Sequence, residues 1–423
     1  MNPRDLLLGS FAAALAAADP LQIVPRHLPS PPKGRTVVVG AGKAAGAMAL
    51  AVETAWPADR PLEGVVITRY GHGLPTQRIR VVEAGHPVPD ESGERAAHEI
   101  LALAKSLGED DLLLVLVSGG GSALLSAPVP AVSMADLKAV TRQLLACGAP
   151  IQDMNTVRKH LSTIQGGRLA VASRAQVVAL VISDVTGDDP THIASGPCAP
   201  DPTTFADAQE VLRLHGVEPP ASIAAHLARG AKGEEPETPK PDDQIFTRVE
   251  NVVIATAHQS LMTASAFVQA RGITPMVLGD SVTGESREVA KVYAALARQI
   301  HQHSHPLKRP VALISGGETT VTIRGNGRGG RCTEFLLSLA VDLAGLDHVH
   351  ALAADTDGID GSESNAGAIL LPDSIARAAA LGHSAKAMLA DNDGYSFFAA
   401  LNDLVITGPT RTNVNDFRII LVQ

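Results

Sequence analysis

The feature that most restricts the fold of this chain is an uninterrupted apolar run, Leu112 to Val117, that leads directly into Ser118-Gly-Gly-Gly-Ser122. A strand without polar alternation is typical of the interior of a parallel sheet, where both faces are covered. Glycines at the carboxyl end of such a strand, followed by a helix, form a recurrent phosphate-binding arrangement at the edge where open α/β sheets bind ligands. A plain tight turn needs fewer glycines, so we interpret this loop as a binding site. Its candidate residues are Ser118, Gly119, Gly120, Gly121 and Ser122.

The same order of elements returns in the second half of the chain. An apolar strand, Val311 to Ile314, leads into a stretch that ends at Arg331, where a helical pattern begins. Three arginines lie among six glycines there, and arginine is the side chain best suited to binding carboxylate or phosphate at two points. For any one arginine, simple solvation explains the residue equally well, but the group predicts an anion site. Its candidate residues are Gly316, Gly317, Glu318, Arg328 and Arg331.

Length and a local change in composition indicate two domains. A chain of 423 residues is too long for one ordinary core. Between Arg229 and Gln244 the sequence is rich in Gly, Glu, Pro, Lys and Asp, which is typical of an exposed linker or long loop. We therefore predict an N-terminal domain over residues 1–235 and a C-terminal domain over residues 245–423, with the closing strand able to pack back on the first domain.

Composition excludes several classes of partner. The net charge of −9 and the aromatic content of 3% argue against a nucleic-acid-binding protein. The apolar N-terminal run, Leu6 to Ala18, has helical spacing and is shorter than a membrane span. Three widely spaced cysteines form neither a disulfide framework nor a metal motif. We expect a soluble cytoplasmic protein, a monomer or homodimer, that acts on a small molecule and binds no nucleic acid or membrane.

A further glycine loop follows the first predicted strand. Thr36 to Val39 leads into Gly40-Ala-Gly-Lys-Ala-Ala45, the G-x-G-x-x-A form of the dinucleotide fingerprint. The next strand ends in Arg69 rather than in the acid that the ribose of NAD requires, which disfavours NAD and leaves NADP open. A lysine in the first turn of a helix is well placed for a phosphate, although it can also simply cap the helix end. The candidate binding residues are Gly40, Gly42 and Lys43.

Acidic residues follow two other predicted strands, at Ser183 to Asp189 and at Asp355 to Gly361. Carboxylates are hard oxygen ligands for Mg²⁺ and can also act as bases, while loop capping accounts for at least one of them. We predict Mg²⁺ ligands at Asp184, Asp188 and Asp189. Arg158 lies in a locally basic region and either holds an acidic substrate or lies on a solvated helix face.

Together these groups are the ones that phosphoryl transfer requires, because its catalysis consists mainly of positioning and charge neutralisation. The ordered motifs also closely resemble the MOFRL-type glycerate kinases over nearly the whole chain. The motifs that carry the resemblance are Gly40-Ala-Gly-Lys43, Ser118 to Ser122, Arg158-Lys-His-Leu-Ser162, Ile182 to Asp189, Ile193-Ala-Ser-Gly-Pro197, Gly327-Arg-Gly-Gly-Arg331, Thr356 to Gly361 and Thr407-Gly-Pro-Thr410.

The resemblance implies ATP- and Mg²⁺-dependent phosphorylation of D-glycerate, most often at the 2-hydroxyl, which gives 2-phospho-D-glycerate and ADP. It implies an α/β fold of two domains: a Rossmann-like N-terminal domain with a mostly parallel sheet and a smaller C-terminal α/β domain, with the active site in the cleft between them. By position, the lysine and arginine implicated in catalysis in the family are Lys43 and Arg331, with Asp357 as their acidic companion. Asn413, in the polar loop before the closing strand, joins the predicted binding residues.

Our hypothesis at this point is that Lys43 and Arg331 hold the glycerate carboxylate and the transferring phosphoryl group, while Asp357 orients or deprotonates the substrate hydroxyl. The chain departs from the family pattern at Cys332-Thr333, where Asn-Gln is usual, at Arg411, and at Gly394, where serine is usual. These departures leave a related three-carbon or tartrate-derived hydroxy acid open. Two other functions also remain open: an NAD(P)H-dependent hydroxypyruvate reductase, a label that members often carry, and a non-catalytic anion-binding module.

Overall fold

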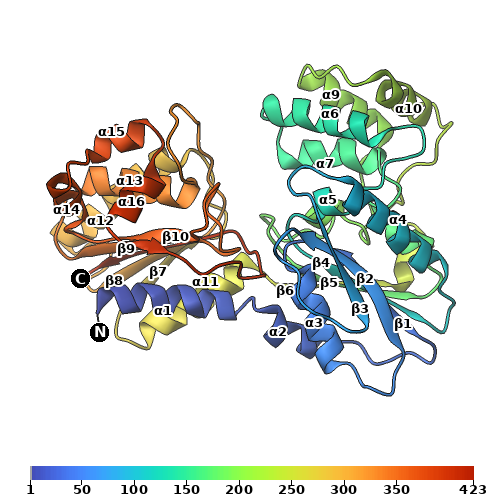
Figure 1. Ribbon diagram of the computed structural model, residues 1–423, viewed down its shortest axis with the longest axis horizontal. Coiled ribbons are helices and arrows are strands. Elements are labelled where there is room, and N and C mark those ends of the chain that lie inside the picture. The colour runs from blue at the N-terminus through green and yellow to red at the C-terminus, as the bar shows by residue number, and fades with distance from the viewer. Residues whose placement is uncertain (1) are drawn as a thin grey trace. The chain divides into compact units, whose positions relative to one another are not determined.

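The computed structural model describes residues 2–423, which form two compact units (Figure 1). One unit, Pro20–Ile254, is called the parallel-sheet unit here. The other combines residues 2–19 with Ala255–Gln423 and is called the mixed-sheet unit. This division differs from the predicted domains, because the first helix joins the C-terminal part of the chain and the boundary falls at residues 254–255 instead of 235–245.

The parallel-sheet unit is built on a six-stranded sheet in the order β3-β2-β1-β4-β5-β6. Its strands are β1 (Thr36–Ala41), β2 (Leu62–Arg69), β3 (Ile79–Ala84), β4 (Leu112–Val117), β5 (Gln176–Ile182) and β6 (Val249–Ala255). The pairs β3–β2, β2–β1, β1–β4 and β4–β5 are parallel. This order is that of the Rossmann fold, so the strand order reverses between β1 and β4, which is where such sheets bind ligands. The predicted Rossmann-like domain is confirmed, and β6, which falls within the range predicted for the C-terminal domain, lies at the edge of this sheet.

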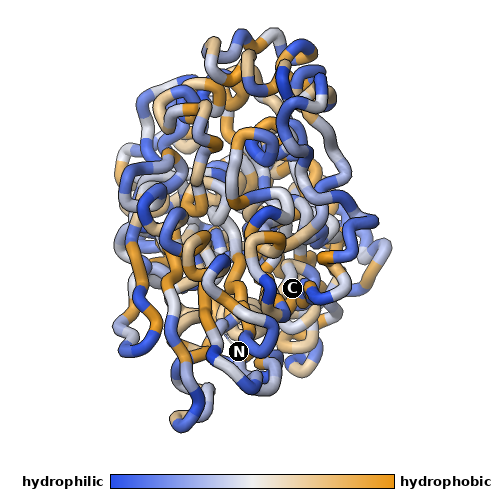
Figure 2. Tube along the Cα trace, turned by 90° about the vertical axis from the view of Figure 1, so that its right-hand side faces the viewer, coloured by the Kyte–Doolittle hydropathy of each residue, from blue (hydrophilic) through white to orange (hydrophobic). Residues whose placement is uncertain are grey.

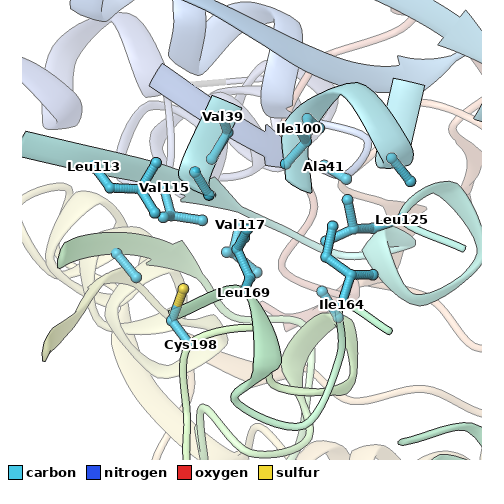
Figure 3. Close-up of a cluster of buried hydrophobic side chains, with 14 of the residues drawn as sticks. Val39, Ala41, Ile100, Leu113, Val115, Val117, Leu125, Ile164, Leu169 and Cys198 are labelled. Atoms are coloured by element: carbon cyan, nitrogen blue, oxygen red, sulfur yellow. The ribbon is translucent and has the colours of Figure 1, made fainter. Parts of the chain in front are cut away.

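Helices on this unit enclose an aliphatic core. They are α2 (Pro20–Ile23), α3 (Ala45–Ala55), α4 (Glu91–Lys105), α5 (Gly121–Leu124), α6 (Met134–Ala146), α7 (Ile151–His160), α8 (Arg168–Ala172), α9 (Phe205–Leu214) and α10 (Ala221–Ala231), with short 3₁₀ turns η1 (Val24–His27), η2 (Ile193–Ser195) and η3 (Gln244–Arg248). Val39, Val115 and Val117 of the central strands pack with Ile100 of α4 and Leu169 of α8 (Figure 3). Central strands that are buried on both faces explain why β4 lacks polar alternation.

A second apolar cluster lies among α6, α7, α9 and α10, which gather at one end of the unit (Figure 1). The segment between Arg229 and Gln244, which was predicted to be an exposed linker, is bonded to this helical group. Glu237 accepts a hydrogen bond from the backbone N–H of Phe205 at 2.9 Å, and Lys240 donates to the side chain of Thr238, which is 1% exposed. These polar contacts hold the segment on the unit, which is why the boundary lies further along the chain.

The mixed-sheet unit has a six-stranded sheet in the order β11-β10-β9-β12-β8-β7. Its strands are β7 (Thr274–Gly279), β8 (Val311–Ser315), β9 (Val349–Asp355), β10 (Gly367–Leu370), β11 (Leu404–Val405) and β12 (Asp416–Val422). Only β7–β8 is parallel, and β12 runs antiparallel to both of its neighbours, β8 and β9. The closing strand, whose seven residues are all buried, therefore lies in the middle of this sheet and pairs on both sides.

Both faces of the mixed sheet are covered by helices. These are α1 (Pro3–Ala16), α11 (Ala257–Gln269), α12 (Ser286–His303), α13 (Arg331–Leu343), α14 (Ser374–Ala380), α15 (Ala385–Ala390) and α16 (Gly394–Ala400). Alternate residues along the strands pack on opposite faces: Ile419 joins the cluster under α1 and α11, whereas Ile420 joins the cluster under α12 and α13. Along the trace, hydrophilic segments form many of the outermost loops (Figure 2).

The N-terminal helix α1 lies beside α11 and packs on the mixed sheet (Figure 1). Leu6, Leu7 and Phe11 are at most 2% exposed, and the ring of Phe11 stacks on that of Phe417 with 5.8 Å between centroids. The predicted helix is confirmed. Within residues 2–423, no single helix has the length and apolar composition to cross a membrane; α1 taken together with the Pro20–His27 helix meets both criteria, with a bend of 48° between them.

Candidate active site

The loops after β1 and β4 are distant in the sequence but contact each other where the strand order of the parallel sheet reverses. The backbone N–H of Lys43 donates to Gly119 O at 2.8 Å, and that of Ala44 donates to Ser118 Oγ at 3.0 Å. Gly42 must lack a side chain, because a Cβ there would lie 2.0 Å from Ser118 Oγ. These contacts use two amides at the start of α3 that a dinucleotide pyrophosphate would need, which disfavours the dinucleotide interpretation of this loop.

The loop after β4 presents unused amides. Within residues 2–423, no acceptor is bonded to the backbone N–H groups of Gly119, Gly120 and Ser122. Gly120 has a φ of 81°, and a Cβ at this position would lie 2.9 Å from His86 Nε2 and 3.4 Å from Lys43 Cγ. A left-handed glycine thus lies between a lysine and a histidine, among amides that have no acceptor, and consecutive free amides of this kind bind phosphate oxygens.

Arg158, on α7 of the same unit, is a half-buried cation with no internal counterion. Among the described residues, its guanidinium forms no ion pair, side-chain hydrogen bond or ring contact. Removal from water lowers its pKa from the ordinary value to about 10, and no acidic neighbour raises it. The neighbouring Lys159 is, by contrast, paired with Asp201 at 3.3 Å. The structure thus distinguishes Arg158 from the structural cations around it.

The three aspartates after β5 do not come together as a metal site. Residues 2–423 contain no group of three or more His, Cys, Asp or Glu side chains arranged to hold a metal ion. Asp189 accepts the backbone N–H of Thr191 at 2.9 Å and so caps its own loop, while Asp188 occupies a left-handed turn with φ 55°. Binding of Mg²⁺ by Asp184, Asp188 and Asp189 stays a prediction. Asp184, half-buried and two residues beyond β5, remains at the sheet edge where β4 ends.

In the mixed-sheet unit, Arg331 begins α13 and is held by three carboxylates. Its Nε donates to Asp416 at 2.7 Å, Nη2 to Asp355 at 2.8 Å, and Nη1 to Glu318 at 2.8 Å. Burial alone would lower the pKa of Arg331, but the charges of these three acids raise it above its ordinary value. A guanidinium has five N–H groups, so two are left for a ligand while the side chain is fixed.

The acidic residues that follow β9 form hydrogen bonds with different parts of the unit. Asp357, 2% exposed, accepts the backbone N–H of Ile359 at 2.8 Å, and its own N–H donates to Asp355. Asp360 caps α13, because its carboxylate accepts the backbone N–H groups of Cys332 and Thr333 at 2.9 and 2.8 Å. Burial raises the pKa of Asp360 to about 6, although these hydrogen bonds oppose the shift. The positive end of α13 is therefore already neutralised by an internal carboxylate.

The glycine-rich stretch before α13 is filled by the chain itself. Asn392 Oδ1 accepts the backbone N–H groups of Arg324 and Gly325, at 2.7 and 3.1 Å. The next three amides donate to Asp391 and Asp393. Arg328 is exposed, lies 4.7 Å over the ring of Tyr395 and donates weakly to Ser396. The amides of residues 324–328 are therefore bonded within the fold, and the glycines there admit the loop at 391–393.

Gly316 and Gly317, which were also predicted to bind an anion, make contacts within the fold. Gly316 donates its N–H to Gly279 O, and its carbonyl accepts from Arg418 at 3.1 Å. A Cβ on Gly317 would lie 2.3 Å from the backbone N of Val282. Asn413 is 5% exposed, and its Oδ1 accepts the N–H of Asn415 in the loop before β12. These residues shape the strand edge around Arg331.

Two of the three departures from the family pattern, at Cys332-Thr333 and at Gly394, lie next to each other. Cys332 and Thr333 are fully buried, and Thr333 Oγ1 donates to Asp360 at 2.8 Å. A Cβ on Gly394 would lie 3.0 Å from Thr333 Cβ, so the missing side chain at 394 makes room for the residue at 333. Both departures therefore act through packing behind α13.

Sequence reasoning missed four residues of these sites. Asp416 and Arg418, 1% exposed, form an ion pair at the start of β12 and hold Arg331 and the Gly316 carbonyl. Ser195 and Asn155 lie behind Ser122. Asp416 and Arg418 could have been noticed in the sequence, because they are two charged residues at the start of an otherwise apolar closing strand. No local pattern indicated Ser195 or Asn155.

Two sequence families match the chain: the one described as a domain of unknown function (DUF4147) matches residues 6–228, and the MOFRL family matches residues 311–416. A curated protein of Agrobacterium vitis, provisionally named hydroxypyruvate reductase, is 48% identical over 100% of this chain and 95% of its own length. The D-glycerate 2-kinase of Thermotoga maritima is 38% identical over 99% of this chain and 98% of its own length. A crystal structure of glycerate kinase from Thermotoga maritima superposes with a TM-score of 0.88 at 37% identity, covering 99% of both chains.

Proposed function

The chain belongs to the MOFRL family that includes the glycerate 2-kinases, and we infer from this membership and from its site that it is a kinase of D-glycerate. The reaction transfers a phosphoryl group from ATP to the 2-hydroxyl and gives 2-phospho-D-glycerate and ADP. The 2-position is the one named for the Thermotoga maritima relative.

The observation that carries phosphoryl transfer is the row of unused amides at Gly119, Gly120 and Ser122 beside Lys43. Transferring phosphoryl groups carry charge on oxygens that accept hydrogen bonds, and fixed amides and cations stabilise this charge without reorganising. Lys43 supplies a cation at the position where the β1 and β4 loops meet. We propose that these amides and Lys43 hold phosphate oxygens of ATP.

The residues also fit a magnesium ion held in the way that nucleotide sites hold it. Mg²⁺ usually takes one or two carboxylates together with substrate phosphates and does not need an all-protein cage. We propose Asp184 as its protein ligand, because it is a hard oxygen donor at the sheet edge where β4 and its amide loop end. When bound, the ion neutralises phosphate charge; Asp188 and Asp189 shape the turn beside it.

In the mixed-sheet unit, we propose that Arg331 stabilises the transferring phosphoryl group with its two remaining N–H groups. Its three acidic partners keep the guanidinium charged and in one orientation. Asp357 is the proposed acid that orients or deprotonates the reacting hydroxyl, since it is buried and its neighbour Asp355 is committed to Arg331. Glu318, Gly316, Gly317, Arg328 and Asn413 support this edge of the sheet in the proposal.

The setting is proposed on similar grounds. All three cysteines are free thiols, which suits the reducing cytoplasm in which ATP-dependent kinases work. The absence of nucleic-acid or membrane partners and a monomeric or dimeric state stay predictions.

The test is turnover of the purified protein with D-glycerate, ATP and Mg²⁺, measuring ADP and resolving the two phosphoglycerates by NMR. A parallel reaction contains hydroxypyruvate and NADPH, because 48% identical relatives carry a reductase name. We expect glycerate-dependent ADP and the 2-phospho isomer, with NADPH unchanged. Loss of NADPH without formation of ADP would overturn the kinase assignment.

A further inference from the structure

The loop before β12, residues 407–415, is bonded directly to the turn that carries Asp357. The backbone N–H of Thr410 donates to the carbonyl of Asp357 at 3.1 Å, and its hydroxyl donates to the carbonyl of Thr356. Further along the loop, the N–H of Val414 donates to the hydroxyl of Thr356 at 2.9 Å. The backbone of this loop is therefore fixed relative to Asp357, the acid proposed above to meet the reacting hydroxyl.

Arg411 lies in the middle of this loop, in a backbone conformation that is unfavourable for it. Its φ is 61°, in the left-handed region. Of the ten non-glycine residues with positive φ in residues 2–423, the other nine are Ala, Ser, Asp, Asn or His. The neighbours on both sides hold the conformation: Thr410 by the bonds just described, and Thr412, 2% exposed, through a hydrogen bond to Ala18 O at 2.7 Å. Strained backbone that its surroundings fix in this way gathers at binding sites.

The guanidinium of Arg411 forms no bond inside the protein. Its Nε is buried without a hydrogen-bond partner, and within residues 2–423 its two terminal nitrogens form no hydrogen bond, ion pair or ring contact. Three other arginines have a buried Nε without a hydrogen bond, but their terminal nitrogens are used: Arg248 bonds to Ser173, Arg377 to Asp403 and Arg418 to Asp416. The fold thus accepts an unfavourable backbone and an unpaired donor at Arg411 without an internal bond in return. Such exceptions are expected at functional sites.

The other arginines at this edge of the mixed sheet are already paired. Arg331 is held by three carboxylates, and Arg418, 1% exposed, is bonded to Asp416 and to the carbonyl of Gly316. No carboxylate among the described residues lies within ion-pair distance of Arg411, which is half-buried. Its terminal nitrogens are therefore available to an anionic ligand, and a planar guanidinium binds a carboxylate at two points.

The chemistry of a 2-hydroxy acid requires its two receptors to be neighbours. The carboxylate is attached to the same carbon as the reacting hydroxyl, so a group that binds the carboxylate must come from a residue close to the one that meets the hydroxyl. Thr410 is bonded to Asp357, and Arg411 follows it in the chain, with the two Cα atoms about 3.8 Å apart. Arg411 is thus an unpaired cation that begins one residue away from a direct contact with Asp357.

We propose that Arg411 binds the carboxylate of the phosphoryl acceptor and so restricts the enzyme to 2-hydroxy acids, excluding neutral acceptors of the same size. The identity of the acid as D-glycerate, and the place of its hydroxyl at Asp357, rest on the proposed kinase function. The assignment moves the carboxylate from Lys43 and Arg331, which then serve the phosphoryl group alone.

The first test compares D-glycerate with D-glyceramide, in which a neutral amide replaces the carboxylate. Binding of each is measured by titration calorimetry on the full-length protein, with and without the non-hydrolysable analogue β,γ-imido-ATP and Mg²⁺. Arg411→Gln should raise the Kd for D-glycerate roughly 10–100-fold, because charge-assisted hydrogen bonds are lost. The Kd for D-glyceramide should stay within about twofold, because the amide carries no charge for the guanidinium to bind.

Two further variants sharpen this comparison. Arg411→Lys keeps the charge without the planar pair of donors, so its Kd for D-glycerate should fall between those of wild type and Arg411→Gln. Arg271→Gln removes an exposed arginine that follows α11 in the same unit and should leave both Kd values unchanged.

The second test separates binding from a structural role. Arg411→Gly removes the side chain but places in the left-handed position the residue that adopts it without strain. We expect its melting temperature to equal or exceed that of wild type, while its Kd for D-glycerate rises as in Arg411→Gln. A lower melting temperature, together with equal losses of D-glycerate and D-glyceramide binding, would make Arg411 a residue that only shapes the loop and would overturn the proposal.

Failure of this inference is distinguishable from failure of the kinase assignment. Equal Kd values for D-glycerate in wild type and Arg411→Gln would overturn the role of Arg411. The same holds if wild type binds no D-glycerate either with or without the ATP analogue. If D-glycerate binds through Arg411 but wild type forms no ADP from ATP, the carboxylate site stands and the kinase function falls.

Discussion

Two glycine-rich loops, one in each unit, follow a buried strand and precede a helix, yet their amides have opposite fates. After β4, Gly119, Gly120 and Ser122 keep N–H groups without an acceptor among the described residues. Over residues 324–328, the amides donate instead to Asp391, Asn392 and Asp393 of a distant loop. The first loop is open to a ligand, whereas the second is already bound to the protein.

The helix starts repeat this contrast. The backbone N–H of Ala44, before α3, donates to the neutral hydroxyl oxygen of Ser118, whereas the first amides of α13 donate to the carboxylate of Asp360. Glycine allows a neighbouring group to approach the backbone closely in both loops. After β4 we expect that group to be a ligand, whereas before α13 it is a buried carboxylate of the protein. A glycine-rich sequence therefore predicts a close neighbour without saying whether that neighbour is substrate or protein.

The largest expected effect separates the two cations of the proposed mechanism. Lys43→Ala should lower kcat/KM on the order of 1,000-fold, because a charge that stabilises the transferring phosphoryl group is lost. Its melting temperature should stay within a few °C of wild type, roughly the effect of losing one half-buried side chain outside the core. Steady-state kinetics and calorimetry of the same preparation check both values.

Arg331→Ala should lose comparable activity and also about 3–5 kcal/mol of unfolding free energy, because Asp355 and Asp416 lose a partner in a buried cluster. An unchanged melting temperature for this variant would show that the three-carboxylate clamp is not structural.

The next effect concerns pH and the carboxylate cap of α13. The native state holds a proton on Asp360 up to about pH 6, its raised pKa, whereas the unfolded chain releases it near 3.8. Stability from this group is therefore full below about pH 4 and is lost as the pH rises through 6. The loss is roughly 3 kcal/mol, since each pKa unit is worth about 1.4 kcal/mol.

Urea unfolding of wild type and Asp360→Asn between pH 4 and pH 7 measures this slope. The variant has no group to titrate at 360, so the difference between the two free energies should change across the window. Parallel curves would mean that Asp360 has an ordinary pKa.

A smaller effect is expected when residues 324–328 lose their hydrogen bonds to the loop at 391–393. Asn392→Ala removes the acceptor for the N–H groups of Arg324 and Gly325, as well as the donor to Glu334 at 2.9 Å. We expect a loss of about 2 kcal/mol, because water replaces only part of these bonds. Hydrogen exchange should show lower protection at 324 and 325, with ATP affinity unchanged. The exposed Asn326→Ala provides the control; weaker ATP binding in Asn392→Ala would contradict the contrast between the loops.

The smallest effects come from a matched pair of glycine substitutions. Gly120→Ala forces a Cβ into a left-handed position beside His86, at a cost of about 1–2 kcal/mol, and should lower kcat/KM about tenfold or more by displacing Lys43. Gly327→Ala would place a Cβ 2.5 Å from Asp391 O and should cost stability by about 1–3 kcal/mol with kinetics unchanged. Enzyme assays and thermal denaturation of both variants separate the outcomes, and a kinetic defect confined to Gly327→Ala would reverse the comparison.

The sequence was sufficient for features that depend on local pattern. The apolar β4, the start of α13 at Arg331 and the Rossmann-like strand order all follow from periodicity, glycine placement and family motifs. The ordered motifs also led to the glycerate kinase family, which the full-length relatives confirm.

Features set by contacts between distant segments were not predictable in this way. Nothing in residues 324–328 shows that acceptors more than sixty residues later occupy their amides. The same holds for α1, whose apolar face is equally consistent with either unit, and for β12, whose position between β8 and β9 is a matter of topology. The hydrogen bonds behind Ser122 likewise depend on Asn155 and Ser195, which come from two further segments.

The place of α1 has a consequence for biosynthesis. Leu6, Leu7 and Phe11 leave the ribosome before the entire parallel-sheet unit, but their packing partners on α11 and β12 are translated after it. At about 5–20 residues per second, the helix waits on the order of tens of seconds with its apolar face uncovered. The parallel-sheet unit can fold cotranslationally in that interval, whereas the mixed-sheet unit must wait for its central strand, so a nascent chain stalled between the two is the form most in need of a chaperone.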